Sequence, residues 1–549
     1  MGFGRNLIYI VITLLLVLSL ALGTVGCRSS GPMTDPGHTE PSVSSPVPAQ
    51  DEPGMTVPSQ GGDSTQEPNE DETGPEPGPN QGGDHENREP VELPREELPL
   101  AVELKINEDK TTLGPFFGLL PELMWSPDGE YLAIYGQASG YGLWVWERAS
   151  NQVRRLAQLV ERGSYGTTSM NLLGWNQEGD ALLYVIDGVQ PQGSHLGERG
   201  VAVMSVTLDG KRREVAWLPG GFSLIRDHYY SSESGRLLVH RGSDLWSVNT
   251  RSGEAVRLRD DLPTWDGLFA VQFSPTGESV VFPETDPSHH GLVLLDVNSG
   301  REIVIGFQGE YAFYPVWSPD GKKLAYLSAR AEGESFDFQI GEDGPLPPAT
   351  RLAVVTQQGE ELTSWTPPRS EKAGAPVWDE DSTRLAFLSG SLTQDTYGLS
   401  QVSWRRLLLG SLDGTLQDLG MAQGDWITVA GFAPSGQEVI VYRYEASGGV
   451  TVLSYGPNPD QSTILAADAV DEPLIWWDGH LLLPRLSAHA ADSLATQLYL
   501  IRSETKPQAL TQGAGWKSRL TPSGHWLAYL NADNQNAPYP IQVVVQPLR

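Results

Sequence analysis

The side chains that could hold a metal or act as an acid or base are few and scattered. The densest groups are the adjacent His289 and His290 and the acidic run Asp379, Glu380 and Asp381. Neighbouring side chains on a loop usually diverge, so the two histidines do not predict a shared metal. The acidic run lacks the spaced oxygen ligands of a calcium-binding loop. Nucleophile elbows, zinc helices, phosphate loops and dinucleotide fingerprints are all missing, so we predict no catalytic, metal or cofactor site.

One stretch, YPVWSPDGKKLAYLSAR over residues 314–330, predicts the scaffold on which any site must be built. Its two apolar strands flank a tight Pro-Asp-Gly turn, which is the signature of a β-hairpin. Close copies start at Met124, Gln272, Val377, Gly431 and Arg519, with a looser one at Gly174. An isolated hairpin is marginal in water, so repeated hairpins must bury their apolar faces against one another.

Each copy carries an aromatic or similar anchor just before its turn. The structural anchors are Trp125, Trp175, Phe273, Trp317, Trp378 and Phe432, joined by weaker ones near Ser232, Trp477 and Thr521. Four short strands follow from Pro315. Their number and the spacing of the anchors are typical of the four-stranded blade of a β-propeller. Burying a Trp side chain of about 200 Å² is worth roughly 5 kcal/mol, so these Trp residues are predicted to be core.

The predicted fold is therefore all-β, a single propeller of four-stranded blades over residues 101–549. The final unit supplies only three strands, and residues 101–106 form an unpaired strand ahead of the first unit. Placing that strand at the outer edge of the last blade closes the ring and removes an exposed edge. This gives nine blades, with eight as the alternative because four to eight is the usual range.

The WSPDG repeat quoted above resembles the TolB-like, WD-repeat-like propeller family over essentially the whole of residues 101–549. In that family the aromatic lies on the inner strand and packs between blades, and the Asp-Gly pair supplies the turn. The resemblance implies a fold and an interaction module. The long acidic N-terminal segment and the large loops depart from the compact family pattern, which leaves any particular partner open.

Chain direction places the long loops on one face of the ring. In an antiparallel blade the first and third turns share one face, and these are short here. The middle loops 187–200, 284–291, 329–349, 389–401 and 487–495 are long and lie on the other, as in a binding surface on a rigid scaffold. The ligand-binding candidates are Tyr165, His195, His289, His290, Tyr311, Phe313, Phe336, Phe338, Tyr397 and Trp516, for which loop packing is the alternative.

The N-terminus carries Arg5, an apolar run over residues 7–22, and small residues ahead of Cys27, the one cysteine of the 549 residues. This order is typical of a secretory signal that ends at a lipidated cysteine. It resembles the bacterial lipoprotein signal, although Thr24 stands where that family usually has Leu. We therefore expect a signal peptide over 1–26 and lipidation of Cys27. An uncleaved membrane helix is the alternative, and both place the remainder outside the membrane.

Residues 28–100 hold 14 prolines and no aromatic residue, so with Cys27 they predict a disordered tether over residues 27–100. This segment has a net charge of −13, and residues 101–549 have a net charge of −20. Such a surface offers no basic patch for phosphate, which argues against nucleic acid and leaves the lipid anchor as the one predicted membrane contact.

Two function classes remain. The first is a non-catalytic, extracytoplasmic lipoprotein, anchored to the bacterial cell membrane, whose propeller binds an envelope protein, peptide or glycan. The second is a propeller hydrolase or lyase acting on extracellular polysaccharide or peptide. Carboxylates or histidines converging in the central funnel would favour the enzyme, and a funnel of aromatics and backbone would favour the binder.

Overall fold

The computed structural model describes residues 92–93, 103–107, 110–117, 120–138, 140–159, 169–190, 195, 197–220, 225–262, 271–284, 291–307, 309–330, 349–394, 400–424, 426–445, 449–458, 462–486, 496–501, 507–510, 516–532 and 541–548. The predicted signal peptide, Cys27 and nearly all of the predicted tether lie outside these ranges. The chain divides into two units, Met1–Arg88 and Glu89–Arg549. All the described strands belong to the second unit.

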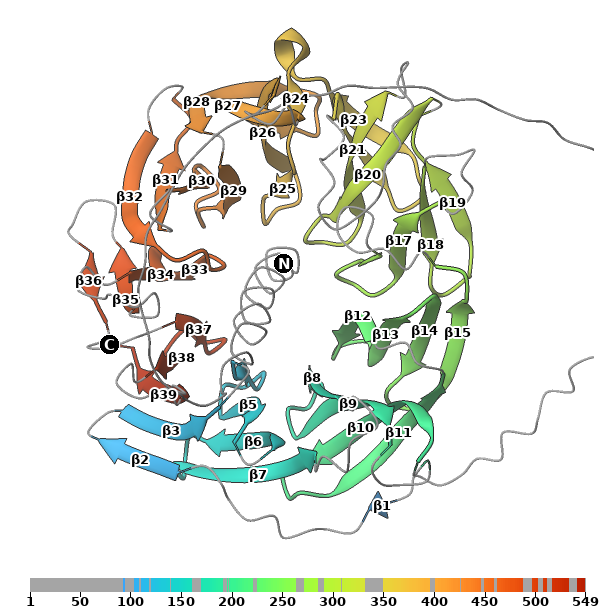
Figure 1. Cartoon of the computed structure of the whole chain (residues 1–549), viewed down its shortest axis with the longest axis vertical. Helices are drawn as coiled ribbons and strands as arrows, with labels where there is room; N and C mark the ends of the chain where they lie inside the picture. The colour runs from blue at the N-terminus through green and yellow to red at the C-terminus, as the bar shows by residue number, and fades with distance from the viewer. Residues whose placement is uncertain are drawn as a thin grey trace, which may run out of the picture. The chain divides into compact units, whose positions relative to one another are not determined.

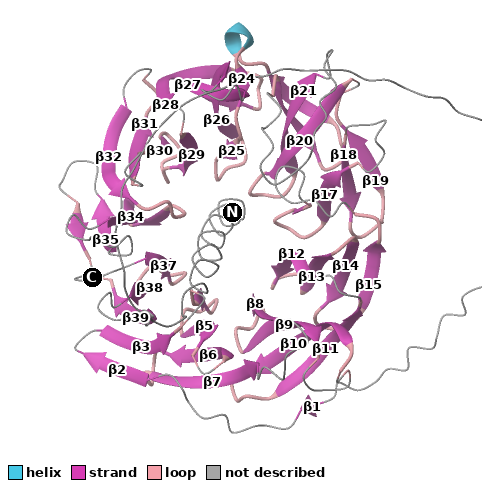
Figure 2. Cartoon of the chain, in the orientation of Figure 1, coloured by secondary structure: helices cyan, strands magenta, loops and turns pink. Residues whose placement is uncertain are grey.

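The described strands of this unit form nine antiparallel groups arranged as a closed ring (Figures 1 and 2), which we call blades 1 to 9. The predicted all-β propeller is confirmed. Among the described residues the strands therefore give nine blades rather than eight. The one helix in these ranges is the 3₁₀ turn η2 (Pro368–Ser370). No helix there has the length and apolar character needed to cross a bilayer.

Blades 1 to 3 follow one another in chain order, each with its first strand toward the centre. Their strands are β4 (Glu122–Trp125), β5 (Tyr131–Gln137), β6 (Tyr141–Glu147) and β7 (Gln152–Leu159); β8 (Ser169–Trp175), β9 (Ala181–Val189), β10 (Arg199–Thr207) and β11 (Arg212–Pro219); and β12 (Ile225–Ser231), β13 (Arg236–Arg241), β14 (Asp244–Asn249) and β15 (Ala255–Arg259).

Blades 4 to 6 repeat the plan, except that Pro376 interrupts the inner strand of blade 6, so that β24 and β25 both pair with β26. Their strands are β16 (Gln272–Phe273), β17 (Ser279–Pro283), β18 (Leu292–Asp296) and β19 (Glu302–Ile305); β20 (Glu310–Trp317), β21 (Lys323–Arg330), β22 (Arg351–Thr356) and β23 (Glu361–Trp365); and β24 (Lys372–Ala373), β25 (Val377–Trp378), β26 (Arg384–Gln394), β27 (Ser400–Ser411) and β28 (Leu416–Gly424).

Blades 7 and 8 are joined into one sheet by a single backbone pairing, Ala469 with Arg485. Their strands are β29 (Ile427–Phe432), β30 (Val439–Tyr444), β31 (Val450–Tyr455) and β32 (Ser462–Ala469), followed by β33 (Ile475–Trp477), β34 (His480–Leu486), β35 (Thr496–Ile501) and β36 (Gln508–Ala509).

Blade 9 combines the two ends of the described chain. It holds β37 (Trp516–Leu520), β38 (Trp526–Ala532) and β39 (Ile541–Pro547), and its fourth strand is β3 (Lys110–Phe116). Closure by an N-terminal strand is thus confirmed, but the predicted strand at residues 101–106 is not the one that closes the ring. That stretch corresponds to β2 (Glu103–Asn107), which pairs with β3 as a fifth, outermost strand.

The reason for this difference is Pro115. A proline inside a strand argues against a ladder position, so residues 110–116 did not suggest a strand. The pairing of β3 with β39 shifts its register between Leu113 and Phe116, and this irregularity accommodates the proline. Leu113 and Phe116 are both fully buried on either side of it.

Pairing also begins earlier in the chain than predicted. β1 (Glu92–Leu93), inside the predicted tether, adds a fifth strand to the outer edge of blade 2 by pairing with β11. Composition does not exclude this, because strand addition at an open edge satisfies backbone groups and requires no apolar side chain.

The core lies between the blades. Nine clusters of buried side chains occur in the described chain, and each draws its members from two adjacent blades. Together they cover every junction of the ring, including the one between blades 9 and 1, where Trp144 and Trp146 are fully buried. The ring is therefore closed by hydrophobic burial as well as by strand pairing.

The predicted aromatic anchors sit at these junctions and add a directional contact. The indole N–H of Trp378 donates to Val316 O at 3.0 Å, so it reaches the inner strand of the preceding blade. The same bond runs from Trp125 to Arg519 O, from Trp175 to Met124 O and from Trp317 to Gln272 O. At Phe432, which has no N–H, the guanidinium of Arg384 lies 5.8 Å from the ring and donates to Gly436 O.

The Ser-Pro-Asp-Gly turn has a local explanation. Ser318 Oγ donates to Asp320 Oδ1 at 2.5 Å and accepts from the Lys323 N–H at 3.0 Å. Gly321 has φ +68°, a left-handed conformation that glycine adopts without strain. Partial burial by itself raises the pKa of Asp320, but hydrogen bonds from Lys323 and Ser318 outweigh it and lower the pKa to about 2. This turn is therefore rigid and contributes little to ligand binding.

We predict that Trp378→Phe lowers the free energy of unfolding by about 2 kcal/mol, because it leaves Val316 O without its donor and a small void at the junction. Urea unfolding followed by circular dichroism measures this. Trp426→Phe is the matched control, since the Trp426 side chain is 74% exposed and its replacement should leave the midpoint unchanged. Equal shifts for both variants would contradict the role given to the indole bond.

Candidate functional site

The two faces of the ring differ in the length of their connections. We call the face that carries the first and third turns of each blade the tight rim, and the opposite face the long-loop rim. On the tight rim every connection within a blade has between two and six residues. On the long-loop rim the middle loops range from two to 20 residues. The strand bounds place all five predicted loops on the long-loop rim. The predicted loop 389–401 is wrong in length, because most of it continues β26 and β27 and only residues 395–399 connect the two strands.

Most of the predicted ligand contacts lie outside the described residues. These are Tyr165, His289, His290, Phe336, Phe338 and Tyr397. Trp516 is the first residue of β37, where its backbone pairs with Leu530, and its side chain is not described. The assignment of these seven side chains to a ligand stays a prediction.

His195 lies in the middle loop of blade 2 and is already engaged. Its ring stacks on Trp217, with centroids 4.1 Å apart and the planes 5° from parallel. Its Nδ1 lies 3.2 Å from Glu198 and its Nε2 lies 3.4 Å from Glu214. Both ring nitrogens and one ring face are therefore taken up by the protein itself, which is the loop-packing role.

Tyr311 and Phe313 lie on the inner strand of blade 5 and face the junction with blade 6. Phe313 is 1% exposed, and Tyr311 packs half-buried against the same cluster. Phe313 is thus a core residue rather than a ligand contact. Strand alternation explains this, because residues 311 and 313 point to the same side of the sheet.

A buried ion pair supports the rim between blades 2 and 3. Asp187 Oδ1 lies 3.6 Å from Arg241 Nε, and both side chains are almost wholly buried. Asp187 Oδ2 also accepts the Ile225 N–H at 2.6 Å, which fixes the start of the next blade. A Cβ at Gly220 would lie 1.7 Å from Arg241 Nη1, so a larger residue there would have to displace the Arg241 guanidinium. Burial raises the pKa of Asp187, and the Ile225 N–H and Arg241 oppose that effect.

A second group of fixed side chains lies where blades 7, 8 and 9 meet the long-loop rim. We call it the Trp426 corner, and it consists of Trp426, Tyr442, Tyr444, Asp471, Glu472 and Lys517. Trp426 precedes β29 and is 74% exposed, the highest value among the large apolar side chains that the structure describes as exposed. Its carbonyl accepts the Tyr444 N–H at 2.9 Å, so its backbone belongs to the ladder of blade 7.

Two tyrosines tie this ladder to the link between β32 and β33. Tyr444 Oη donates to Asp471 Oδ2 at 2.7 Å, and Tyr442 Oη donates to Glu472 O at 2.8 Å. Burial, followed by the hydrogen bond to Asp471, raises the pKa of Tyr444 above its ordinary value. Both hydroxyls therefore remain protonated donors at neutral pH, and they hold the two acidic residues in place.

Blade 9 completes the corner through Lys517. Its backbone N–H donates to both carboxylate oxygens of Glu472, at 2.8 and 3.0 Å. Lys517 has φ +46°, a strained conformation for a residue with a side chain, and the bond to Glu472 stabilises it. Burial raises the pKa of Glu472, while Lys517 and Arg519 act in the opposite direction. Glu472 is thus a structural acceptor.

The corner combines an exposed indole with a carboxylate held by Tyr444, two groups that can bind a partner through stacking and charge. Sequence reasoning missed it, because the residues lie on strands and on short links between blades rather than on the long middle loops. One feature of the sequence does point to the corner. Trp426 follows Gly424 and Asp425 directly after a strand, at a position where a side chain is usually exposed to solvent.

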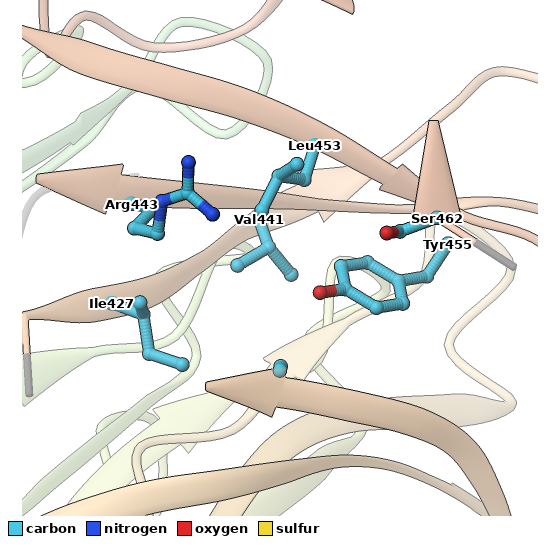
Figure 3. Close-up of a pocket in the computed structure, with 7 residues that line it drawn as sticks. Ile427, Val441, Arg443, Leu453, Tyr455 and Ser462 are labelled. Atoms are coloured by element: carbon cyan, nitrogen blue, oxygen red, sulfur yellow. The ribbon is translucent and has the colours of Figure 1, made fainter. Parts of the chain in front are cut away.

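A cavity of about 320 Å³ lies on the other side of blade 7, at its junction with blade 6. Aliphatic and polar side chains both line it, and Figure 3 shows Arg443 on one side of Val441 with Tyr455 and Ser462 on the other. Arg443 is bound to Glu445 at 3.1 Å, which in turn accepts the Thr451 hydroxyl at 2.7 Å. Within the described ranges, no group of three or more His, Cys, Asp or Glu side chains could hold a metal ion.

No protein-family model matches this chain, and no curated protein matches it in sequence. Solved structures similar to it include an oligogalacturonate lyase in complex with manganese (12% identity, 68% of this chain and 98% of that one, TM-score 0.33). Others are the C-terminal WD40 domain of Sif2 (13%, 79% and 97%, 0.41) and Porphyromonas gingivalis dipeptidyl peptidase 4 (11%, 78% and 58%, 0.43).

We predict that Asp187→Ala lowers the free energy of unfolding by roughly 3–5 kcal/mol, because it leaves the buried Arg241 guanidinium without its carboxylate. Replacing both partners, as Asp187→Leu with Arg241→Met, should recover most of that loss. Urea midpoints of the two variants measure the difference. A double variant no more stable than Asp187→Ala would show that the loss does not come from an uncompensated buried charge.

Proposed function

We propose that this protein is a lipid-anchored envelope lipoprotein whose propeller is a non-catalytic binding module for an extracytoplasmic protein, peptide or glycan. The observation that carries the proposal is the asymmetry of the two rims. Loop length ranges from two to 20 residues on one rim and from two to six on the other, and the first rim also presents the exposed Trp426 on a fixed backbone. Variable loops and rigid aromatic anchors on a stiff scaffold are typical of recognition surfaces.

The first half of the proposal rests on the N-terminal sequence. An apolar run followed by small residues and Cys27 supports export and lipidation, and the proline-rich acidic segment that follows supports display away from the lipid surface. The similarity of the WSPDG repeat to TolB-like propellers supports an interaction module in the envelope.

The proposal that the propeller is a non-catalytic binding module rests on the contacts of the described polar side chains at the rim. His195 is held by Trp217 and two carboxylates, and Glu472 is held by the Lys517 N–H. These groups position the chain, and the exposed surface beside them is aromatic and acidic. That distribution favours binding over acid–base chemistry.

We expect the full-length chain, expressed in a bacterium that processes lipoproteins, to fractionate with membranes, and Cys27→Ser to shift it to the soluble or secreted fraction. The reason is that a diacylglyceryl anchor holds a protein stably, whereas the hydroxyl of serine is not lipidated. Cell fractionation with immunoblotting measures the shift. A Cys27→Ser protein that stayed membrane-bound would favour the uncleaved membrane helix.

We expect Trp426→Ala to reduce capture of an envelope component by the full-length chain at least fivefold, since exposed Trp residues at recognition surfaces commonly contribute about 1–2 kcal/mol. Pull-down from envelope extracts with quantitative mass spectrometry measures this. Ile464→Ala is the matched control, because Ile464 is 62% exposed on the outer strand β32 of the same blade. Equal capture by both variants would place the contact away from the Trp426 corner.

A further inference from the structure

The Trp426 corner contains an exposed aromatic ring on a backbone that is held in the sheet. Ile427, the next residue, is buried in the junction with blade 6, and the Trp426 carbonyl accepts the Tyr444 N–H at 2.9 Å. Direct cross-strand partners share one face of a sheet, with Cβ atoms about 5 Å apart. Trp426 and Tyr444 therefore stand side by side on the face of blade 7 that looks toward blade 8.

The Tyr444 hydroxyl links this aromatic pair to a carboxylate, because it donates to Asp471 Oδ2 at 2.7 Å. The pairing of Trp426 with Tyr444 and the bond from Tyr444 to Asp471 thus place an exposed indole and a carboxylate on the same side of blade 7. A cation attracted to the ring quadrupole gains further from a neighbouring carboxylate, whereas an anion is repelled by both.

Asp471 has fewer described hydrogen bonds than its acidic neighbours Glu472 and Glu445. Glu472 accepts two hydrogen bonds from the Lys517 N–H, and Glu445 is paired with Arg443 at 3.1 Å. Asp471 has Tyr444 as its hydrogen-bonding partner, a neutral group, and in the described part of the chain its Oδ1 has none. Within the described chain Asp471 therefore has no ion-pair partner, and it belongs to residues 101–549, which have a net charge of −20.

We propose that the Trp426 corner binds an arginine or lysine side chain in an extended basic segment of a protein partner. The cation lies over the Trp426 indole and is bound by the free oxygen of Asp471. The inference rests on the proposed binding function and names the chemistry of its partner. An acidic glycan does not fit this charge, and a neutral sugar would use the indole without needing the carboxylate.

The test uses the full-length chain purified in detergent and two capped heptapeptides that alternate glycine with arginine or with glutamine. Isothermal titration calorimetry is run from about 0.05 M to about 0.5 M NaCl. We expect the arginine peptide to bind more tightly than the glutamine peptide, and both Trp426→Ala and Asp471→Asn to weaken it roughly tenfold. Higher salt should weaken binding of the arginine peptide to the wild type.

Two substitutions in the same blade are the controls. Ile464→Ala removes an exposed apolar side chain from the outer strand, and Glu438→Gln removes an exposed acid from the tight rim. Both should leave the affinity unchanged. Equal weakening by Glu438→Gln and Asp471→Asn would reduce the effect to overall charge and overturn the proposal, as would equal affinity for the two peptides. Urea midpoints confirm that each variant is folded.

The outcome also separates this inference from the proposed function. If capture from envelope extracts depends on Trp426 but is insensitive to salt and is not displaced by the arginine peptide, the binding function stands and the basic partner is wrong. Binding of a neutral disaccharide such as maltose that survives Asp471→Asn overturns the proposal in favour of a glycan.

Discussion

The structure depends on the junction between neighbouring blades. A four-stranded blade has two faces to cover, and each can be covered by the next blade around the ring. The indole of Trp378 donating to the carbonyl before Trp317, and that of Trp175 to the carbonyl before Trp125, fixes the angle and height at which blades meet. Hydrophobic burial supplies most of the free energy at these junctions, and the indole bonds supply direction.

This constraint divides the molecule into a part that cannot vary and a part that can. The inner strands and the turns of the tight rim hold the junctions, so their residues are committed to packing and to the Ser-Asp turn network. On the long-loop rim a few side chains, such as Asp187 and Glu472, hold the junctions. The connections there differ in length from blade to blade, and Tyr444, Asp471, Glu472 and Lys517 link blades 7, 8 and 9 through hydrogen bonds. A stiff ring thus positions a small surface patch without any long element of its own.

The acidic balance of the chain then determines what such a patch attracts. Two described carboxylates of the rim, Asp187 and Glu371, each lie 3.6 Å from an arginine nitrogen, of Arg241 and of Arg406 respectively. These carboxylates serve the structure. Asp471 differs because its described partner is the neutral Tyr444 hydroxyl, which orients the carboxylate without cancelling its charge.

The sequence by itself determined the repeat, the aromatic anchors, the position of the turns and the rim on which the loops are long, because each of these depends on residues close together in the chain. It also placed Phe313 among ligand contacts, although strand alternation buries it with its neighbour Tyr311. The tertiary structure alone decided that β3, with its internal proline, closes the ring, since only the bulged pairing with β39 makes that strand acceptable. It alone also assembled the Trp426 corner, because that site joins three blades through side-chain hydrogen bonds that no local pattern encodes.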